Sequence, residues 1–189
     1  MFGGGESFET KAHVKVPQKP WKQLSPQEQA AWSKDFPNTL AKRCQKHGRL
    51  LGIRCNNYST PDQGWSLYNQ LKDQAHKELN QGCRHALAGH LDQAKRAFAY
   101  SFQSRAICDW LFGHLSNWKP NKDDPDGAKH RHQFEILKKA HRALNCSEDG
   151  SFSSKDTKLF EKYKDPYHGG KQHGAVSANE EEEECCAIS

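Results

Sequence analysis

Apolar side chains recur along this chain at steps of three and four residues, the spacing that places them on one face of an α-helix. One series is Tyr68, Leu71, Ala75, Leu79, Gly82 and Ala86. The next series is Leu91, Ala94, Phe98 and Phe102, and Leu111 and Leu115 follow after a gap. Gly89 separates the two series and suits the left-handed position that often ends a helix. We therefore expect residues 61–118 to form a helical hairpin with arms of about 27 residues, each about 40 Å long.

Two capping motifs in the sequence predict where helices begin. Ser25-Pro26-Gln27-Glu28 is a capping box with proline at the first helical position, and Thr60-Pro61-Asp62-Gln63 repeats the start signal. Because proline disfavours a helix interior, we expect the first helix to end before Pro37. Asn38 would then cap a second helix that ends near Gly48.

The remaining segments alternate between turn-rich and helical composition. Residues 50–59 and 121–127 are predicted to be loops, with Asp126 as a candidate cap for the helix that follows. That helix is expected from Ala128 to Asn145, and a short one at residues 155–164. Only helical periodicity extends beyond a few residues, so the predicted fold class is all-α.

The composition limits how much of the chain can fold. Hydrophobic residues make up 34% of the 189 residues, against roughly 45–50% in an ordinary soluble domain. Residues 1–24 and 165–189 contain few apolar side chains and are predicted to be disordered tails. Residues 25–164 are predicted to form one small helical domain built around the long αα-hairpin.

The sequence ends Cys185-Cys186-Ala187-Ile188-Ser189. Its last four residues resemble a CaaX box: a cysteine, two aliphatic residues and a serine of the kind that farnesyltransferase prefers. The resemblance implies farnesylation of Cys186, removal of residues 187–189 and methylation of the new carboxylate.

A single prenyl chain is only a marginal membrane anchor, and stable attachment needs a second signal. The residues before the box, Glu180 to Glu184, are acidic, so a basic run in the tail does not provide that signal. Cys185 is therefore either a palmitoylation site or a bystander cysteine.

The other cysteines point to ordinary thiols in a reducing compartment. They lie at positions 44, 55, 83, 108 and 146, without a CxxC pair. The first residues lack the basic and apolar regions of a secretory signal, and no stretch is long and apolar enough to span a membrane. We expect a cytoplasmic protein with reduced thiols and neither a bound metal nor a cofactor.

Positive charge is concentrated in the body of the chain. Without the five tail glutamates, residues 1–179 contain 28 basic and 18 acidic residues, a net charge of +10. The helix predicted at 128–145 carries Lys129, Arg131, Lys138, Lys139 and Arg142. This basic patch is either a surface for the phosphates of nucleic acid or anionic lipid, or a solvated helix face.

Small and aromatic residues are regularly spaced at the turn of the hairpin: Gly82, Gly89, Asp92, Ala94 and Phe98. Their spacing is similar to that of a tetratricopeptide helix pair. The resemblance implies close approach of two helices, with the aromatic ring filling the space beside the small residues. His85 and Ser101 depart from the pattern and no second copy occurs, so an ordinary αα-hairpin is the alternative.

The functional prediction combines these features. The chain contains none of the GxSxG, GxxxxGK[ST] and GxGxxG motifs, and we expect it not to be an enzyme. Trp110, Phe112 and Trp118 are candidate exposed contacts for a protein partner, the alternative being that they belong to the core. The predicted function is a lipid-anchored adaptor or regulator at the cytoplasmic face of a membrane; the alternative is a nucleic-acid-binding protein that uses the +10 body.

Overall fold

The computed structural model describes residue 16 and residues 18–47, 52–147 and 150–166. Within these ranges the chain forms five α-helices and two short 3₁₀ turns, and no described residue lies in a β-strand. The predicted all-α fold class is confirmed. The predicted lipidation residues Cys185 and Cys186 lie outside the described residues.

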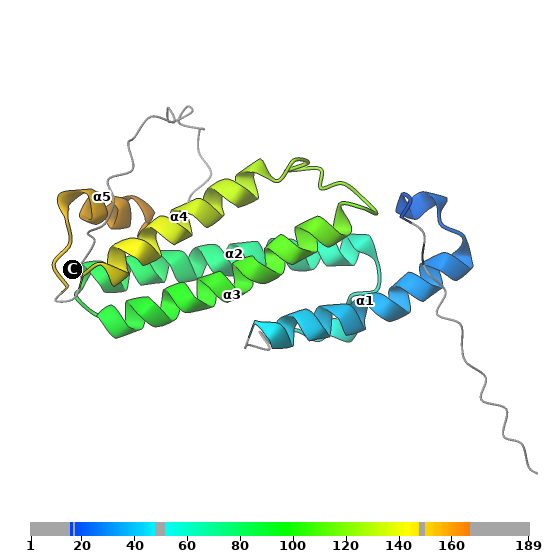
Figure 1. Ribbon diagram of the computed structural model, residues 1–189, viewed down its shortest axis with the longest axis horizontal. Helices are drawn as coiled ribbons and strands as arrows, with labels where there is room; N and C mark the ends of the chain where they lie inside the picture. The colour runs from blue at the N-terminus through cyan, green and yellow to red at the C-terminus, as the bar shows by residue number, and fades with distance from the viewer. Residues whose placement is uncertain (1–15, 17, 48–51, 148–149, 167–189) are drawn as a thin grey trace, which may run out of the picture.

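The long hairpin is the central element of the fold (Figure 1). It consists of α2 (Pro61–Leu87) and α3 (Leu91–Leu115), which lie side by side. The Thr60 hydroxyl accepts a hydrogen bond from the Gln63 amide at 3.3 Å, as the start signal predicts. Gly89 has φ +76° at the turn. The predicted hairpin and its turn are therefore confirmed, with the second arm ending three residues before the predicted position 118.

Close packing at the turn end of the hairpin depends on a small residue. A Cβ atom on Gly82 would overlap the ring of Phe98, which is fully buried. Ser101, where a tetratricopeptide unit usually has alanine, donates its hydroxyl to the Ala75 carbonyl at 2.7 Å. The two arms, 27 and 25 residues long, exceed what a 34-residue repeat unit holds.

The first helix differs from its prediction. Helix α1 (Pro26–Lys46) continues through Pro37, so the predicted break there is wrong. Instead of capping a new helix, Asn38 donates its side-chain amide to the Lys34 carbonyl. The reason is an uninterrupted buried stripe at four-residue steps. Its members are Trp32, Phe36, Leu40 and Cys44. Burial of this stripe offsets the roughly 3 kcal/mol that a proline costs inside a helix.

The capping box at the start of α1 is confirmed. The Ser25 hydroxyl accepts from the Glu28 amide at 3.2 Å, and the Ser25 amide donates to the Glu28 carboxylate at 2.7 Å. The folded body begins before this cap, because the Trp21 amide donates to the Trp118 carbonyl at 2.9 Å. Leu24 is also buried against the body.

Helices α4 (Ala128–Asn145) and α5 (Ser154–Tyr163) cover one side of the hairpin (Figure 1). Helix α4 packs mainly on α3, and α5 packs mainly on α2. Both helices agree with their predicted ranges to within one residue. In the view of Figure 1, α4 lies above the hairpin and α1 below it.

Two apolar clusters hold the body together, one at each end of the hairpin. The first joins α1 to the ends of α2 and α3 that lie away from the turn. The second joins α4 and α5 to the turn end. Between them lies a buried polar layer, which we define as His76, Ser104, Arg105 and His130. Each of these has a buried side-chain nitrogen or oxygen without a hydrogen-bond partner among the described residues.

Candidate functional site

The three aromatic candidates occupy different positions. Trp118 is 8% exposed and packs against Trp32, with ring centroids 6.2 Å apart, so it belongs to the core. Phe112 is half-buried between the hairpin and the start of α4, 5.6 Å from the ring of Trp65. Trp110 is half-buried on α3, and its ring stacks on Phe36 of α1 with centroids 6.1 Å apart.

Trp110 forms a small surface cluster with charged and aromatic neighbours. Its ring stacks on His114 at 5.0 Å and on Phe36 at 6.1 Å, and the Arg43 guanidinium lies 5.7 Å from its centroid. Burial lowers the pKa of His114, so its ring is neutral at pH 7. We call Arg43, Trp110 and His114 the tryptophan patch. Tryptophan and arginine together are typical of contact hot spots.

All five residues of the predicted basic patch are exposed on α4. Lys129 donates to the Asp123 carbonyl and Arg131 to the Asp126 carbonyl, each at 2.8 Å. Lys138 pairs with Glu135 at 2.7 Å. Lys139 and Arg142 make no side-chain hydrogen bond or ion pair with a described residue.

The start of α4 is held by a residue that the sequence analysis overlooked. The buried carboxylate of Asp124 accepts from the amides of Lys129 at 3.0 Å and His130 at 2.9 Å. The predicted cap Asp126 accepts one bond, from the Ala128 amide at 3.1 Å. Asp124 therefore fixes this end of the helix more strongly than Asp126 does.

The centre of the buried polar layer is Arg105. Its side chain is 1% exposed, and its Nη1 atom has no hydrogen-bond partner among the described residues. The Ser104 hydroxyl and both ring nitrogens of His130 are likewise buried without a hydrogen bond. A carboxylate oxygen of Asp109 lies 3.4 Å from the Nε2 atom of His130.

Arg105 affects the titration of the histidines around it. Burial lowers the pKa of His76 and His130, and the positive charge of Arg105 lowers both further. Both rings are therefore neutral at pH 7. Sequence analysis missed this layer, although the apolar series on the second arm skips from Phe102 to Leu111, and Arg105 stands in that gap.

Three thiols of the described region, those of Cys44, Cys83 and Cys108, are buried and lack the environment of reactive cysteines. Burial raises the pKa of Cys44, Cys83 and Cys108 to about 12, so these thiols are protonated at pH 7. Cys44, Cys55, Cys83 and Cys108 are free thiols. Among the described residues, no three histidine, cysteine or carboxylate side chains converge as metal ligands would.

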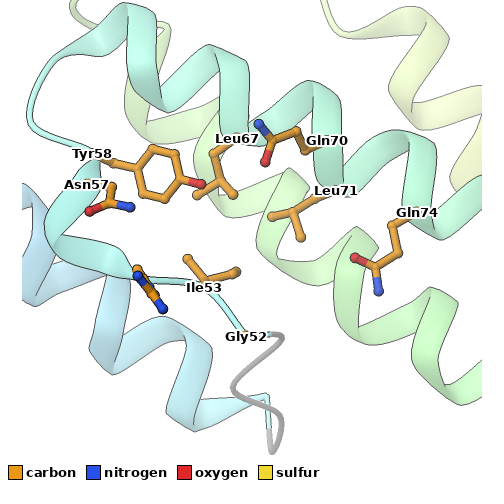
Figure 2. Close-up of a pocket in the computed structure, with 9 residues that line it drawn as sticks. Gly52, Ile53, Asn57, Tyr58, Leu67, Gln70, Leu71 and Gln74 are labelled. Carbon is orange, nitrogen blue, oxygen red and sulfur yellow. The ribbon is translucent and has the colours of Figure 1, made fainter.

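A shallow pocket of about 250 Å³ lies between the η2 segment (Cys55–Asn57) and α2. Figure 2 shows Ile53 and Tyr58 on one side of it and Leu67 and Leu71 on the other. This volume is below the range of about 300–1,000 Å³ that is usual for small-molecule sites. The pocket therefore gives no ground for a ligand.

Comparison with known proteins finds no relative: no family model, no curated protein and no solved structure matches the chain. Across the described residues, none of the helices combines the length and apolar character that a membrane crossing requires.

Proposed function

We propose that this chain is a lipid-anchored helical adaptor that binds a protein partner at the cytoplasmic face of a membrane. The observation that carries the proposal is the sequence Cys186-Ala187-Ile188-Ser189, which follows a folded helical body. The proposal assigns the body no catalytic role and no cofactor.

The anchor is a thioether on Cys186. The thiolate displaces diphosphate from a farnesyl diphosphate, hydrolysis of the Cys186–Ala187 peptide bond then releases residues 187–189, and a methyl donor esterifies the new carboxylate. The five glutamates at 180–184 lie next to this anchor and are repelled by an anionic leaflet. Palmitoylation of Cys185 would strengthen the attachment against this repulsion.

We assign the contact with the protein partner to the tryptophan patch. Trp110 is half-buried, so its ring is both held in place by α1 and accessible at the surface. Arg43 adds a donor over the ring. A rigid aromatic with a neighbouring guanidinium loses little entropy on binding, which favours it as the anchor of an interface.

Affinity purification from eukaryotic cells tests the proposal, with three tagged forms compared. We expect the wild type to retain a defined set of proteins in the membrane fraction and Cys186→Ser to shift to the soluble fraction. Trp110→Ala should lose the partner while remaining membrane-bound. The matched control is Tyr100→Ala, an exposed aromatic elsewhere on α3, which should retain it. A wild type that is soluble, or a partner that Trp110→Ala retains, contradicts the proposal.

The five residues of the basic patch, all exposed on α4, would make the contacts in a second candidate function, nucleic-acid binding. Binding of this kind weakens steeply with salt, because each neutralised phosphate releases a counterion. Titration of the unlipidated protein with RNA or DNA at several salt concentrations would measure that slope. A protein that binds neither at low salt excludes this candidate.

A further inference from the structure

We infer that the outer face of α4 and α5 docks on the anionic headgroups of a lipid bilayer. The folded body then provides the second membrane signal that the acidic tail lacks. This inference rests on the proposed function, because the lipid on Cys186 brings the body to the membrane.

The part of the basic patch that runs from Arg131 to Arg142, which we call the basic stripe, points away from the core. The buried face of this helix is formed by Leu137, Ala140 and Leu144. At 100° per residue, Arg131 and Arg142 fall on the opposite side of the helix. The stripe between them is about 16 Å long, so its charges can reach a flat surface together.

Helix α5 extends the same face. It lies on the same side of the hairpin as α4 (Figure 1) and turns Phe160 toward the core. Its lysines Lys155, Lys158 and Lys162 are exposed. Together the two helices carry eight lysines and arginines against three carboxylates. The face is therefore strongly positive, and it is complementary to an anionic leaflet.

Several of these charges have no partner within the described fold. Lys139 and Arg142 on α4, and Lys155 and Lys158 on α5, make no side-chain ion pair with a described residue. Among the described residues, Asp123, Asp124 and Asp126 lie at the start of α4, where Asp124 is already bonded to backbone amides. Glu148 and Asp149 follow the end of α4 in the sequence and lie outside the described residues. The end of α4 and the adjoining α5 thus form the most positive part of the face.

The length of the tail allows the face and the lipid to engage together. Nineteen residues lie between Pro166, the last described residue, and Cys186. A chain of this length spans at most about 65 Å, several times the length of the stripe. Anchoring at Cys186 therefore leaves the body free to turn α4 and α5 toward the leaflet. Their attraction also opposes the repulsion of the glutamates at 180–184.

The face favours a bilayer over nucleic acid because it offers charge without stacking surfaces. Proteins that bind single strands usually present exposed aromatic rings to the bases. Here Phe134 and Tyr163 are both half-buried, and the amines of Lys138 and Lys162 lie 5.0 and 5.5 Å from their respective ring centroids. The compact positive charge of a lysine ammonium is sufficient to bind anionic lipid headgroups, because this attraction depends on charge rather than on a shaped contact.

Vesicle co-sedimentation of the full chain tests this inference. Cys185→Ser and Cys186→Ser are present in every sample, so that no lipid anchor contributes. The probes are phosphatidylcholine vesicles with and without phosphatidylserine, at low and at physiological salt. The test variant combines K138Q, K139Q and R142Q, which lie at the end of α4. The matched control combines K34Q, K42Q and K46Q, three exposed lysines of α1.

We expect the parent to bind only the vesicles that contain phosphatidylserine, and less at physiological salt. Each basic residue near the surface contributes about fivefold to partitioning, so the α4 variant should bind at least tenfold more weakly. The α1 variant should bind within about twofold of the parent. Circular dichroism of both variants should match that of the parent.

Three results would overturn the inference. The parent fails to bind the anionic vesicles, both variants weaken equally, or RNA displaces the protein from the vesicles and binds it more tightly. The last result assigns the face to nucleic acid. None of them bears on the lipid itself, because these proteins are unlipidated and the modification of Cys186 is measured separately by mass.

Discussion

Two glycines within the hairpin helices have opposite surroundings. A Cβ on Gly82 would overlap the buried Phe98 ring, whereas a Cβ on Gly113 meets nothing within 4 Å. Gly82→Ala should therefore lower the free energy of unfolding by about 1–3 kcal/mol through overpacking. Gly113→Ala should raise it by up to about 1 kcal/mol, because alanine is the better helix former. Urea unfolding measures both; equal stability of the two variants would show that Phe98 can move aside.

Arg105 also has a measurable effect on its neighbours. Replacing it with methionine, which keeps an unbranched chain, should raise the pKa of His76 and His130, since Arg105 lowers both. His114 is the internal control, because its pKa is lowered by burial and by Arg43 rather than by Arg105. NMR titration of the ring protons gives all three values. A shift of His114 as large as that of His130 would indicate a general loosening instead.

Residues that act through their sequence neighbours could be predicted, and residues that act through the tertiary fold could not. The capping box at Ser25 and the turn at Gly89 depend on positions within four residues, so their motifs suffice. The burial of Arg105 depends on α4 crossing the hairpin, which no local pattern encodes. Trp118 is core for the same reason, since α1 covers it.

At the scale of the elements, two aspartates beside the start of α4 make different contacts, although they look alike in the sequence. Asp124 accepts two backbone amides and is buried, while Asp126 accepts one and is exposed. Asp124→Ala should cost about 1–2 kcal/mol of stability, in line with the loss of a helix cap, and Asp126→Ala clearly less. Thermal or urea unfolding of the pair decides this. The reverse order would mean that Asp126 is the cap after all.

Helix α1 shows why element boundaries are harder to predict than element types. Pro37 is a strong local stop signal, and its effect on the backbone is real. The stripe from Trp32 to Cys44 continues across it at helical spacing, however, and tertiary burial outweighs the local signal. The helical character of the segment was predictable; its continuity depended on packing against α3.

The whole molecule should lose stability in mild acid. Four described histidines, His47, His76, His114 and His130, have pKa values lowered by burial. Below about pH 6.5 these rings bind protons in the unfolded chain, whereas in the folded chain they stay neutral to lower pH. The free energy of unfolding therefore falls as the pH falls. Urea unfolding at pH 7.5, 6.5 and 5.5 should show a steady decrease. A constant or rising stability over this range would contradict the burial of neutral rings.

The arrangement of surfaces fits a protein that sits between a membrane and a partner. The basic face lies on α4 and α5, and the tryptophan patch lies where α1 meets α3. Since α4 and α1 lie on different sides of the hairpin in Figure 1, a body with α4 toward the leaflet leaves the patch free for a partner. Both proposals thus use separate surfaces and do not compete.

The lipid on Cys186 is the central claim, and intact-mass spectrometry of the protein from eukaryotic cells tests it most directly. We predict a chain that ends at Cys186, without Ala187 to Ser189, and that carries the added mass of one farnesyl and one methyl group. An additional palmitoyl mass would place the second lipid on Cys185. An unmodified chain that still ends at Ser189 would contradict the lipid anchor.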